Sequence, residues 1–297
     1  MTVERPSGRP IPLLKAGSPE WMARMSASKI AAVVGLSPYQ SRYSLWMRMA
    51  GLVAPEEQSD EMARGHYLEP GCAAWFADQH PEFRVETTGT WVHRDHDWMV
   101  ASPDRLGVRE DGHTVLVQCK TAGDRENWGA AGSDEVPVGY RKQVMWEMLV
   151  TGVSTCYFAT LLPYLEFREY VVRFDEAEAA ELAAAARQFL DSLAAGVRPR
   201  IDEHKATYEA VKQLHPQIRD EQVEVPEAIA ELYLDAIEME KAAKDQKRFA
   251  SALLADHMGT AREAWAGGRK IAQRQVKADG IPFVCVARGA VKKERAA

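Results

Sequence analysis

A predicted β-hairpin between residues 97 and 120 constrains the fold more than any other feature of this sequence. Its two strand-like segments, 97–108 and 114–120, are joined across Asp111-Gly112, a pair that favours a tight turn between antiparallel strands. Pro103 has no backbone N–H to donate to a strand, so we expect the first strand to be irregular near this residue. An irregular strand end allows a side chain to face a cleft rather than the sheet.

The rest of the first two thirds of the chain predicts an α/β domain. Helical spacing or helix-end signals occur at 26–35, 37–52, 59–79, 134–152 and 175–195, and strand-like segments at 83–93, 154–163 and 167–174. The helix at 134–152 lies between strands, which predicts a mixed sheet with a helical crossover, flanked by helices. Pro70-Gly71 should bend or interrupt the helix at 59–79, beside Glu69.

A change in composition near residue 200 predicts a domain boundary. We expect a flexible lead at 1–20, one α/β domain at 21–200, and a third region at 201–297. In this third region a long helix should span roughly 226–264, followed by a β-hairpin at 267–289 that turns at Ala278-Asp279-Gly280. The sequence therefore predicts a mainly helical C-terminal extension that ends in a β-hairpin, of uncertain function.

The overall composition is that of a globular protein of a reducing compartment. Hydrophobic residues make up 46% and charged residues 27% of the 297 residues, which is sufficient for a buried core. The four cysteines are far apart and form no CxxC pair, so we expect neither disulfides nor structural zinc, and a cytoplasmic location. No apolar run has membrane-spanning length, and the N-terminus lacks the apolar segment of a signal peptide.

The net charge of −6 is unevenly distributed along the chain. Residues 241–297 hold 13 Lys and Arg against 5 Asp and Glu, whereas residues 201–240 are acidic. A basic C-terminal region suggests a polyanion partner, with Arg269, Lys270 and Arg274 as candidate DNA contacts. The alternative is an ordinary solvated helix and a charged tail.

The end of the hairpin carries the residues that could support metal chemistry. Alternation in 114–120 places Gln118 and Lys120 on one face, and the hairpin can bring Asp104 beside them. The Asp104 carboxylate and the Gln118 amide oxygen are hard ligands suited to Mg²⁺ or Mn²⁺, with Glu69 and the main-chain carbonyl of Cys119 as further oxygen donors. Lys120 would orient water or stabilise negative charge on a phosphate. From spacing alone, solvated polar residues on two strands are the alternative.

Gln118 reduces the charge expected at such a site. Glu69 and Asp104 contribute two negative charges and Lys120 one positive charge, one negative charge fewer than with an acid at position 118. We therefore expect modest metal affinity, with Mn²⁺ effective at lower concentration than Mg²⁺.

Five blocks in order make the chain resemble a known family of enzymes. They are "SASKIAAVVGLSPYQSRYSLWMRMAGL", "GHYLEP" with Glu69, "ASPDRLG" with Asp104, "LVQCKTA" with Lys120, and "YRKQVMWEMLVTG" with Gln143. On these blocks, from about Trp21 to Phe174, the chain resembles the YqaJ/lambda-exonuclease family of phage recombination nucleases in the PD-(D/E)xK superfamily. Gln118 stands where the family's pattern has an acid.

The resemblance implies a fold, an activity and partners. It implies a PD-(D/E)xK restriction-endonuclease-like core and a Mg²⁺-dependent exonuclease, with Mn²⁺ as a possible substitute, that degrades the 5′-ended strand of linear duplex DNA and leaves a 3′ overhang. It also implies a ring-like trimer or tetramer, a single-strand annealing protein as partner, and a phage or prophage origin in a bacterial host. Gln143 would help to shape the site, and Arg24, Ser28 and Tyr140 would contact DNA. The alternative is a DNA-binding or scaffold protein of this fold that has lost cleavage.

Overall fold

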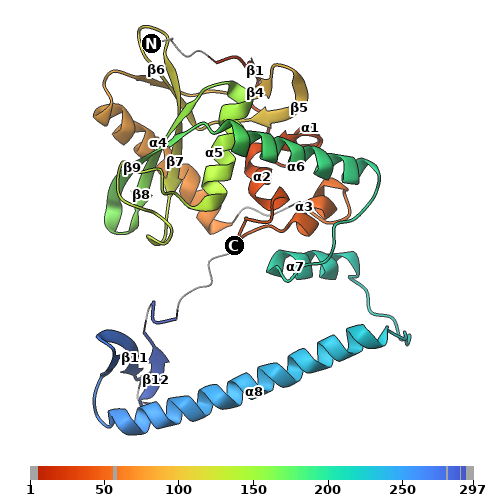
Figure 1. Cartoon of the computed structure of the whole chain (residues 1–297), viewed down its shortest axis with the longest axis vertical. Helices are drawn as coiled ribbons and strands as arrows, with labels where there is room; N and C mark the ends of the chain where they lie inside the picture. Colours follow the sequence, from red (N-terminus) through yellow and green to blue (C-terminus); the bar gives the residue numbers. More distant parts are fainter. Residues whose placement is uncertain (1–5, 56–58, 279, 288, 292–297) are drawn as a thin grey trace. The chain divides into compact units, whose positions relative to one another are not determined.

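The computed structural model describes residues 6–55, 59–278, 280–287 and 289–291 of the chain. The chain divides into two compact units, the first extending to Gln217 and the second beginning at Ile218. Figure 1 shows both units, with most of the strands and most of the helices in the first.

The central sheet of the first unit has five strands in the order β3-β6-β7-β8-β9. Their bounds are β3 (Arg84–Glu86), β6 (Arg105–Val108), β7 (Thr114–Thr121), β8 (Thr155–Leu162) and β9 (Glu166–Arg173). Strands β7 and β8 are parallel and the other neighbours are antiparallel. The predicted hairpin is confirmed, because β6 and β7 pair across a turn in which Gly112 has a φ of +86°.

A second, four-stranded sheet has the order β1-β4-β5-β2. Its strands are β1 (Arg9–Ile11), β2 (Met25–Ser26), β4 (Thr90–His93) and β5 (His96–Ala101). The segments 83–93 and 97–108, each predicted as one strand, are therefore each divided between the two sheets. The second division falls at 102–104, where Pro103 cannot donate to a ladder.

The helices of the first unit are short except for three. They are α1 (Pro19–Met22), α2 (Ala27–Val33), α3 (Arg42–Met49), α4 (Asp60–Gln79), α5 (Val138–Thr151), α6 (Glu176–Ala194) and α7 (Lys205–Leu214), with a 3₁₀ turn η1 (Pro163–Leu165). Helix α4 begins where the Ser59 side chain accepts the N–H of Met62, and α5 ends at Gly152 with a φ of +73°. Helix α4 also continues through Pro70, so of the predicted bend or interruption at Pro70-Gly71, the interruption is wrong.

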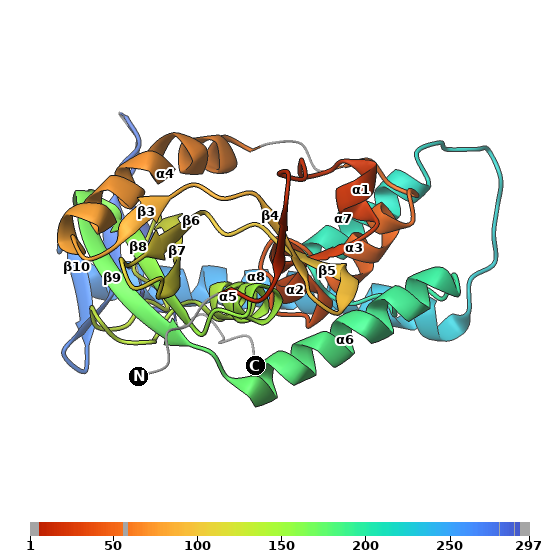
Figure 2. The same cartoon turned by 90° about the horizontal axis from the view of Figure 1, so that it is seen from above.

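The central sheet lies between two helical layers. Figure 2 shows α4 over one face of the sheet and α5 against the other. On the α4 side, Cys72 and Phe76 pack with Val115 and Val117 of β7. On the α5 side, Leu116 of the same strand joins the larger core, which includes Val144 and Trp146 of α5, Ile30 of α2, and Leu182 and Phe189 of α6. Strand alternation thus gives each face of β7 its own core.

Two predicted boundaries of the first unit need correction. Residues 9–11 form β1, paired with β4, and the N–H groups of Ser7 and Gly8 donate to the carbonyl of Thr151 at 2.8 and 3.0 Å, so 1–20 is not wholly a flexible lead. At the other end, α7 packs on α3, and the Thr207 hydroxyl donates to the Ser41 hydroxyl at 2.6 Å. The compact unit therefore extends beyond the predicted boundary near residue 200.

The second unit consists of one long helix and a small antiparallel sheet. The elements are α8 (Glu227–Met258), β10 (Glu263–Ala266), β11 (Arg269–Gln275) and β12 (Phe283–Val286). The predicted hairpin is present as β11 and β12; Asp279 of its turn lies outside the described residues. The helix ends before the predicted residue 264, because Gly259 has a φ of +53° and β10 begins at Glu263.

The predicted fold class, a mixed sheet flanked by helices with a mainly helical extension that ends in a β-hairpin, is confirmed. Over the part of the chain that the structure describes, no helix is both long and apolar enough to span a membrane.

Candidate active site

The end of β7 brings together three of the residues expected to form the site. The Cys119 N–H donates to Oδ2 of Asp104 at 2.8 Å, and Lys120 Nζ lies 3.8 Å from the same oxygen. Asp104 reaches this position because the chain leaves the second sheet at residues 102–104 and enters β6 directly afterwards. The strand irregularity at Pro103 therefore places a carboxylate against the end of the neighbouring strand.

Gln118 is completely buried beside Lys120. Lys120 Nζ donates to Oε1 of Gln118 at 2.9 Å, which confirms that the two side chains share one face of β7. The other end of the Gln118 amide, Nε2, donates to Oε2 of Glu147 at 2.6 Å. The buried amide is thus satisfied at both ends.

Helix α5 contributes Gln143 and Glu147 to the same cluster. Gln143 Nε2 donates to Oε1 of Glu147 at 2.9 Å and lies 3.5 Å from Oε1 of Gln118. Gln143 thus links the helix to the sheet at the site. Sequence reasoning missed Glu147, although a glutamate four residues after Gln143 falls on the same helix face, which was the available signal.

Glu69 lies against a residue that the sequence analysis did not include. Its Oε1 is 2.5 Å from Nη1 of Arg105, which also donates to the main-chain carbonyl of Asp104 at 2.5 Å. Arg105 neutralises Glu69 and holds it near Asp104. The charge count expected from sequence is therefore wrong in two respects, because it omitted Arg105 and Glu147.

Burial shapes the ionisation of the cluster. Burial raises the pKa of Asp104, although Lys120 and the Cys119 N–H favour its ionised form. Burial, together with the charge of Asp104, raises the pKa of Glu147 to about 8. Burial alone would lower the pKa of Lys120, but Asp104 and Glu147 outweigh this effect and raise it. The lysine is therefore held as a cation.

The donor atoms suit a hard divalent cation. In the described ranges, no three His, Cys, Asp or Glu side chains are grouped to hold a metal ion, so a site here depends on neutral oxygen atoms as well. Asp104 offers a carboxylate and Gln118 an amide oxygen. The carbonyl of Cys119 faces the same edge as its N–H, because both groups of one strand residue point to the same neighbour. This oxygen set fits Mg²⁺ or Mn²⁺.

The expected DNA contacts of the first unit lie in two places. Tyr140, in the first turn of α5, has its ring 5.4 Å from Lys120 Nζ and is half-buried. Ser28 is exposed at the start of α2, and its hydroxyl is 3.2 Å from that of Ser26. The carbonyl of Arg24 accepts from the buried Lys29 Nζ at 2.6 Å. Only Tyr140 contacts the cluster around Lys120.

The three basic residues of the second unit differ in their contacts. Lys270 Nζ donates to Oε1 of Glu263 at 2.7 Å, and Arg274 donates to the carbonyl of Gly259. Arg269 is exposed. Two of the three expected basic residues are therefore engaged by groups of the second unit itself.

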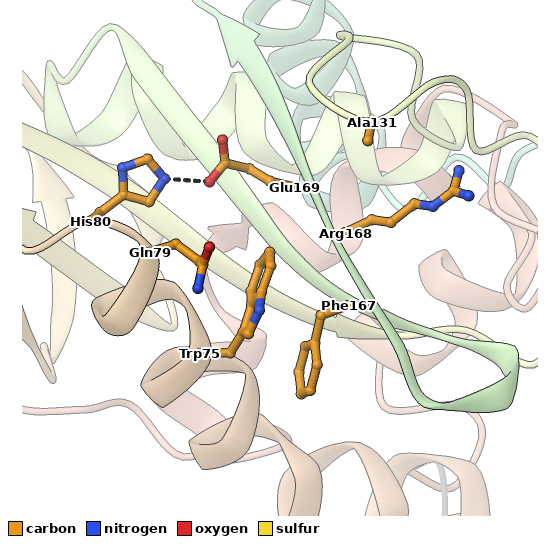
Figure 3. A pocket seen from close by; sticks show the side chains of 7 residues that line it. All are labelled: Trp75, Gln79, His80, Ala131, Phe167, Arg168 and Glu169. Carbon is orange, nitrogen blue, oxygen red and sulfur yellow. Dashed lines mark hydrogen bonds and ion pairs between the residues drawn. The ribbon is translucent and has the colours of Figure 1, made fainter.

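A separate hollow of about 360 Å³ lies on the α4 side of the sheet (Figure 3). Trp75 stacks on Phe167 with ring centroids 5.1 Å apart, and His80 Nε2 is 2.5 Å from Oε2 of Glu169. Phe167 and Glu169 project from β9 to the face opposite Lys120, because Lys120, Thr160 and Arg168 are partners across the sheet. The hollow is thus distinct from the candidate active site.

The candidate site lies within a segment of the chain that matches a known family. The model of the YqaJ-like viral recombinase domain matches residues 20–154, a segment that contains Glu69, Asp104, Lys120 and Glu147. This match confirms the resemblance predicted from the sequence.

The individual relatives share little of their sequence with this chain. The chain is 24% identical over 208 residues to the uncharacterized protein YqaJ of Bacillus subtilis (strain 168), an alignment that covers 67% of this chain and 63% of that protein. Among solved structures, it is similar to the alkaline exonuclease LHK-Exo from Laribacter hongkongensis, with a TM-score of 0.46 and 23% identity over 59% of this chain and 90% of that one. It is also similar to a phage-related exonuclease from Haemophilus somnus 129PT, with a TM-score of 0.43 and 13% identity over 58% of this chain and 96% of that one.

Proposed function

We propose that the chain is a metal-dependent deoxyribonuclease that degrades the 5′-ended strand of linear duplex DNA and leaves a 3′ overhang for recombination. The observation that carries the proposal is the convergence of Asp104, Gln118 and Lys120 at the end of β7, inside the matched domain. The polarity and the role in recombination are supported by the family resemblance.

The residues at the end of β7 divide the chemistry between them. Asp104, the Gln118 amide oxygen and the Cys119 carbonyl would hold Mg²⁺ or Mn²⁺, which when bound supplies a Lewis acid and lowers the pKa of a water nucleophile. Lys120 places a fixed positive charge where negative charge develops on the phosphate. Arg105 holds Glu69 beside this group and so keeps a second carboxylate at its edge.

The proposal extends to partners. Double-stranded DNA ends are the proposed substrate, bound in part through Arg24, Ser28 and Tyr140, with Arg269, Lys270 and Arg274 as contacts from the second unit. A ring-like homo-oligomer and a single-strand annealing protein are the proposed assembly and partner. The family resemblance supports both, and light scattering of the purified chain tests the first.

Cleavage of end-labelled linear duplex tests the proposal. We expect early release of 5′-labelled mononucleotides with Mg²⁺ or Mn²⁺, retention of the 3′ label, no cleavage in EDTA, and no cleavage of closed circular duplex. Binding of duplex without cleavage at any Mg²⁺ or Mn²⁺ concentration would overturn it in favour of a DNA-binding scaffold.

A further inference from the structure

Glu147 is the most buried acidic side chain near the candidate site, with 1% of its surface exposed. Its two oxygens accept from different amides, Oε2 from Gln118 at 2.6 Å and Oε1 from Gln143 at 2.9 Å. A buried carboxylate is stable only if its oxygens are paired in this way. The two contacts therefore give each oxygen of the Glu147 carboxyl group a hydrogen-bond partner.

Glu147 also fixes which way the Gln118 amide points. With Nε2 toward Glu147, Oε1 faces Lys120 Nζ at 2.9 Å. The reversed amide would set an oxygen against the carboxylate and an NH₂ group against the ammonium, losing both hydrogen bonds. Glu147 thus directs the Gln118 oxygen, the atom that can bind a cation, toward the Lys120 side.

The charges of the cluster require Glu147. Asp104 and Lys120 form a pair that sums to zero, and Glu69 is neutralised by Arg105. Without a further acid, the cluster would have no net charge to attract a divalent cation. Burial and the charge of Asp104 raise the pKa of Glu147 to about 8, but a divalent cation beside Gln118 favours the ionised carboxylate. The ionised Glu147 then returns one negative charge from the helix, next to the strand position that lacks it.

We propose that Glu147 is a positioning residue that supplies, from α5, the negative charge that position 118 of β7 lacks. The carboxylate and the amide have exchanged places between helix and strand, and Glu147 acts on the cation through Gln118. The inference rests on the proposed metal-dependent function. The competing explanation is a hydrogen-bond network that only fastens α5 to the sheet.

An exchange of the two residues separates these explanations. The proteins are the full-length wild type, Glu147→Gln, Gln118→Glu, and the double variant Gln118→Glu/Glu147→Gln. Mn²⁺ binding to each is measured by calorimetry without DNA, with thermal melting as the check on folding. Glu169→Gln is the matched control, because it removes a half-buried, hydrogen-bonded carboxylate from the opposite face of the sheet.

We expect Glu147→Gln to weaken Mn²⁺ binding about 10–100-fold, the range typical for residues that orient metal ligands. Gln118→Glu should melt at lower temperature, because it sets two buried carboxylates in contact where 2.6 Å now separates an amide from a carboxylate. The double variant should recover Mn²⁺ affinity to within a few-fold of wild type, and Glu169→Gln should leave it unchanged.

Three results would overturn the inference: wild-type Mn²⁺ affinity in Glu147→Gln, no recovery in the double variant, or no Mn²⁺ binding by the wild type. Should Glu147→Gln not fold, the double variant decides alone, since a fastening network of the same two groups would restore folding without restoring Mn²⁺ binding. If Mn²⁺ binding follows the expected order but no protein cleaves DNA, the assignment of Glu147 stands and the proposed nuclease function fails.

Discussion

The two units of the chain differ in which side chains they bury and which they expose. The first buries Gln118 and Glu147 at its centre, whereas α8 of the second exposes apolar side chains, including Ile229, Leu232 and Phe249. On α8 only Met258 is buried. Burial of polar groups costs stability unless each is paired, so a fold keeps such groups where geometry matters. The difference indicates that the first unit is built around a site and the second around a surface.

Loss of the central charges should have the largest effect. Asp104→Asn and Lys120→Gln remove, respectively, the site's carboxylate and its fixed cation, and each should lower cleavage of linear duplex by about 10²–10³-fold. Initial rates with Mg²⁺ on end-labelled DNA measure this, with the exposed Asp191→Asn on α6 as control. Wild-type rates for Asp104→Asn would show that the polar centre is not the active site.

Truncation of an apolar side chain should distinguish the units next. Trp146 is completely buried and its indole N–H donates to the carbonyl of Val100 at 3.0 Å, so Trp146→Ala should cost about 3–5 kcal/mol in the free energy of unfolding. The Leu232 side chain is 72% exposed, so Leu232→Ala should lower the free energy of unfolding by less than about 0.5 kcal/mol. Urea titration followed by circular dichroism gives both values. A comparable loss for Leu232→Ala, dependent on protein concentration, would mean that another copy covers α8.

A smaller effect is expected for DNA contacts of the second unit. Arg269 is exposed, so if it binds a phosphate, Arg269→Ala should reduce the slope of log binding constant against log salt by about one. Fluorescence anisotropy with duplex DNA at several salt concentrations measures the slope. Arg187→Ala, in which the lost arginine pairs with Asp191 at 2.8 Å, is the control. Equal slopes for both variants and wild type would support the solvated-tail interpretation.

The smallest expected effect is a pH-dependent change in stability caused by His80, in the hollow on the α4 side. Burial opposes protonation of His80, but its bonds to Glu82 and Glu169 outweigh this and raise its pKa above 6.5. The stabilising contribution is therefore complete below pH 6.5 and is lost as pH rises through the folded-state pKa. Melting temperatures of wild type and His80→Gln should differ most near pH 5.5 and converge toward alkaline pH. A constant difference across this range would exclude the charged histidine as the cause.

Local signals in the sequence predicted much of the fold. Asp111-Gly112, Gly152 and Ser59 mark a turn, a helix end and a helix start whose chemistry depends on neighbouring residues alone. The division of 83–93 and 97–108 between two sheets was not predictable, because strand propensity does not say which partner a strand pairs with. Nor was α7 expected, whose position depends on packing against α3.

Part of the candidate site was also predictable from the sequence. Strand alternation correctly placed Gln118 beside Lys120, and the hairpin brought Asp104 to them. Arg105 and Glu147 were missed because their roles depend on contacts between elements distant in sequence, 36 residues for Arg105 with Glu69 and 29 for Glu147 with Gln118. The spacing of Glu147 from Gln143 shows that they share a helix face, but no local pattern encodes the contact of Glu147 with Gln118 or of Arg105 with Glu69.

The contact between Gln118 and Glu147 has a consequence for how such proteins diverge. Glutamate and glutamine codons differ by a single base, so an acid can move from strand to helix in two mutational steps. The order of the steps matters, because an intermediate with two amides remains packable, whereas one with two facing carboxylates is strained. Lineages would therefore pass through a weakly binding ancestor rather than an unstable one. A search for active relatives that demands an acid at the strand position would discard descendants of this path, and scoring the strand and helix positions jointly would retain them.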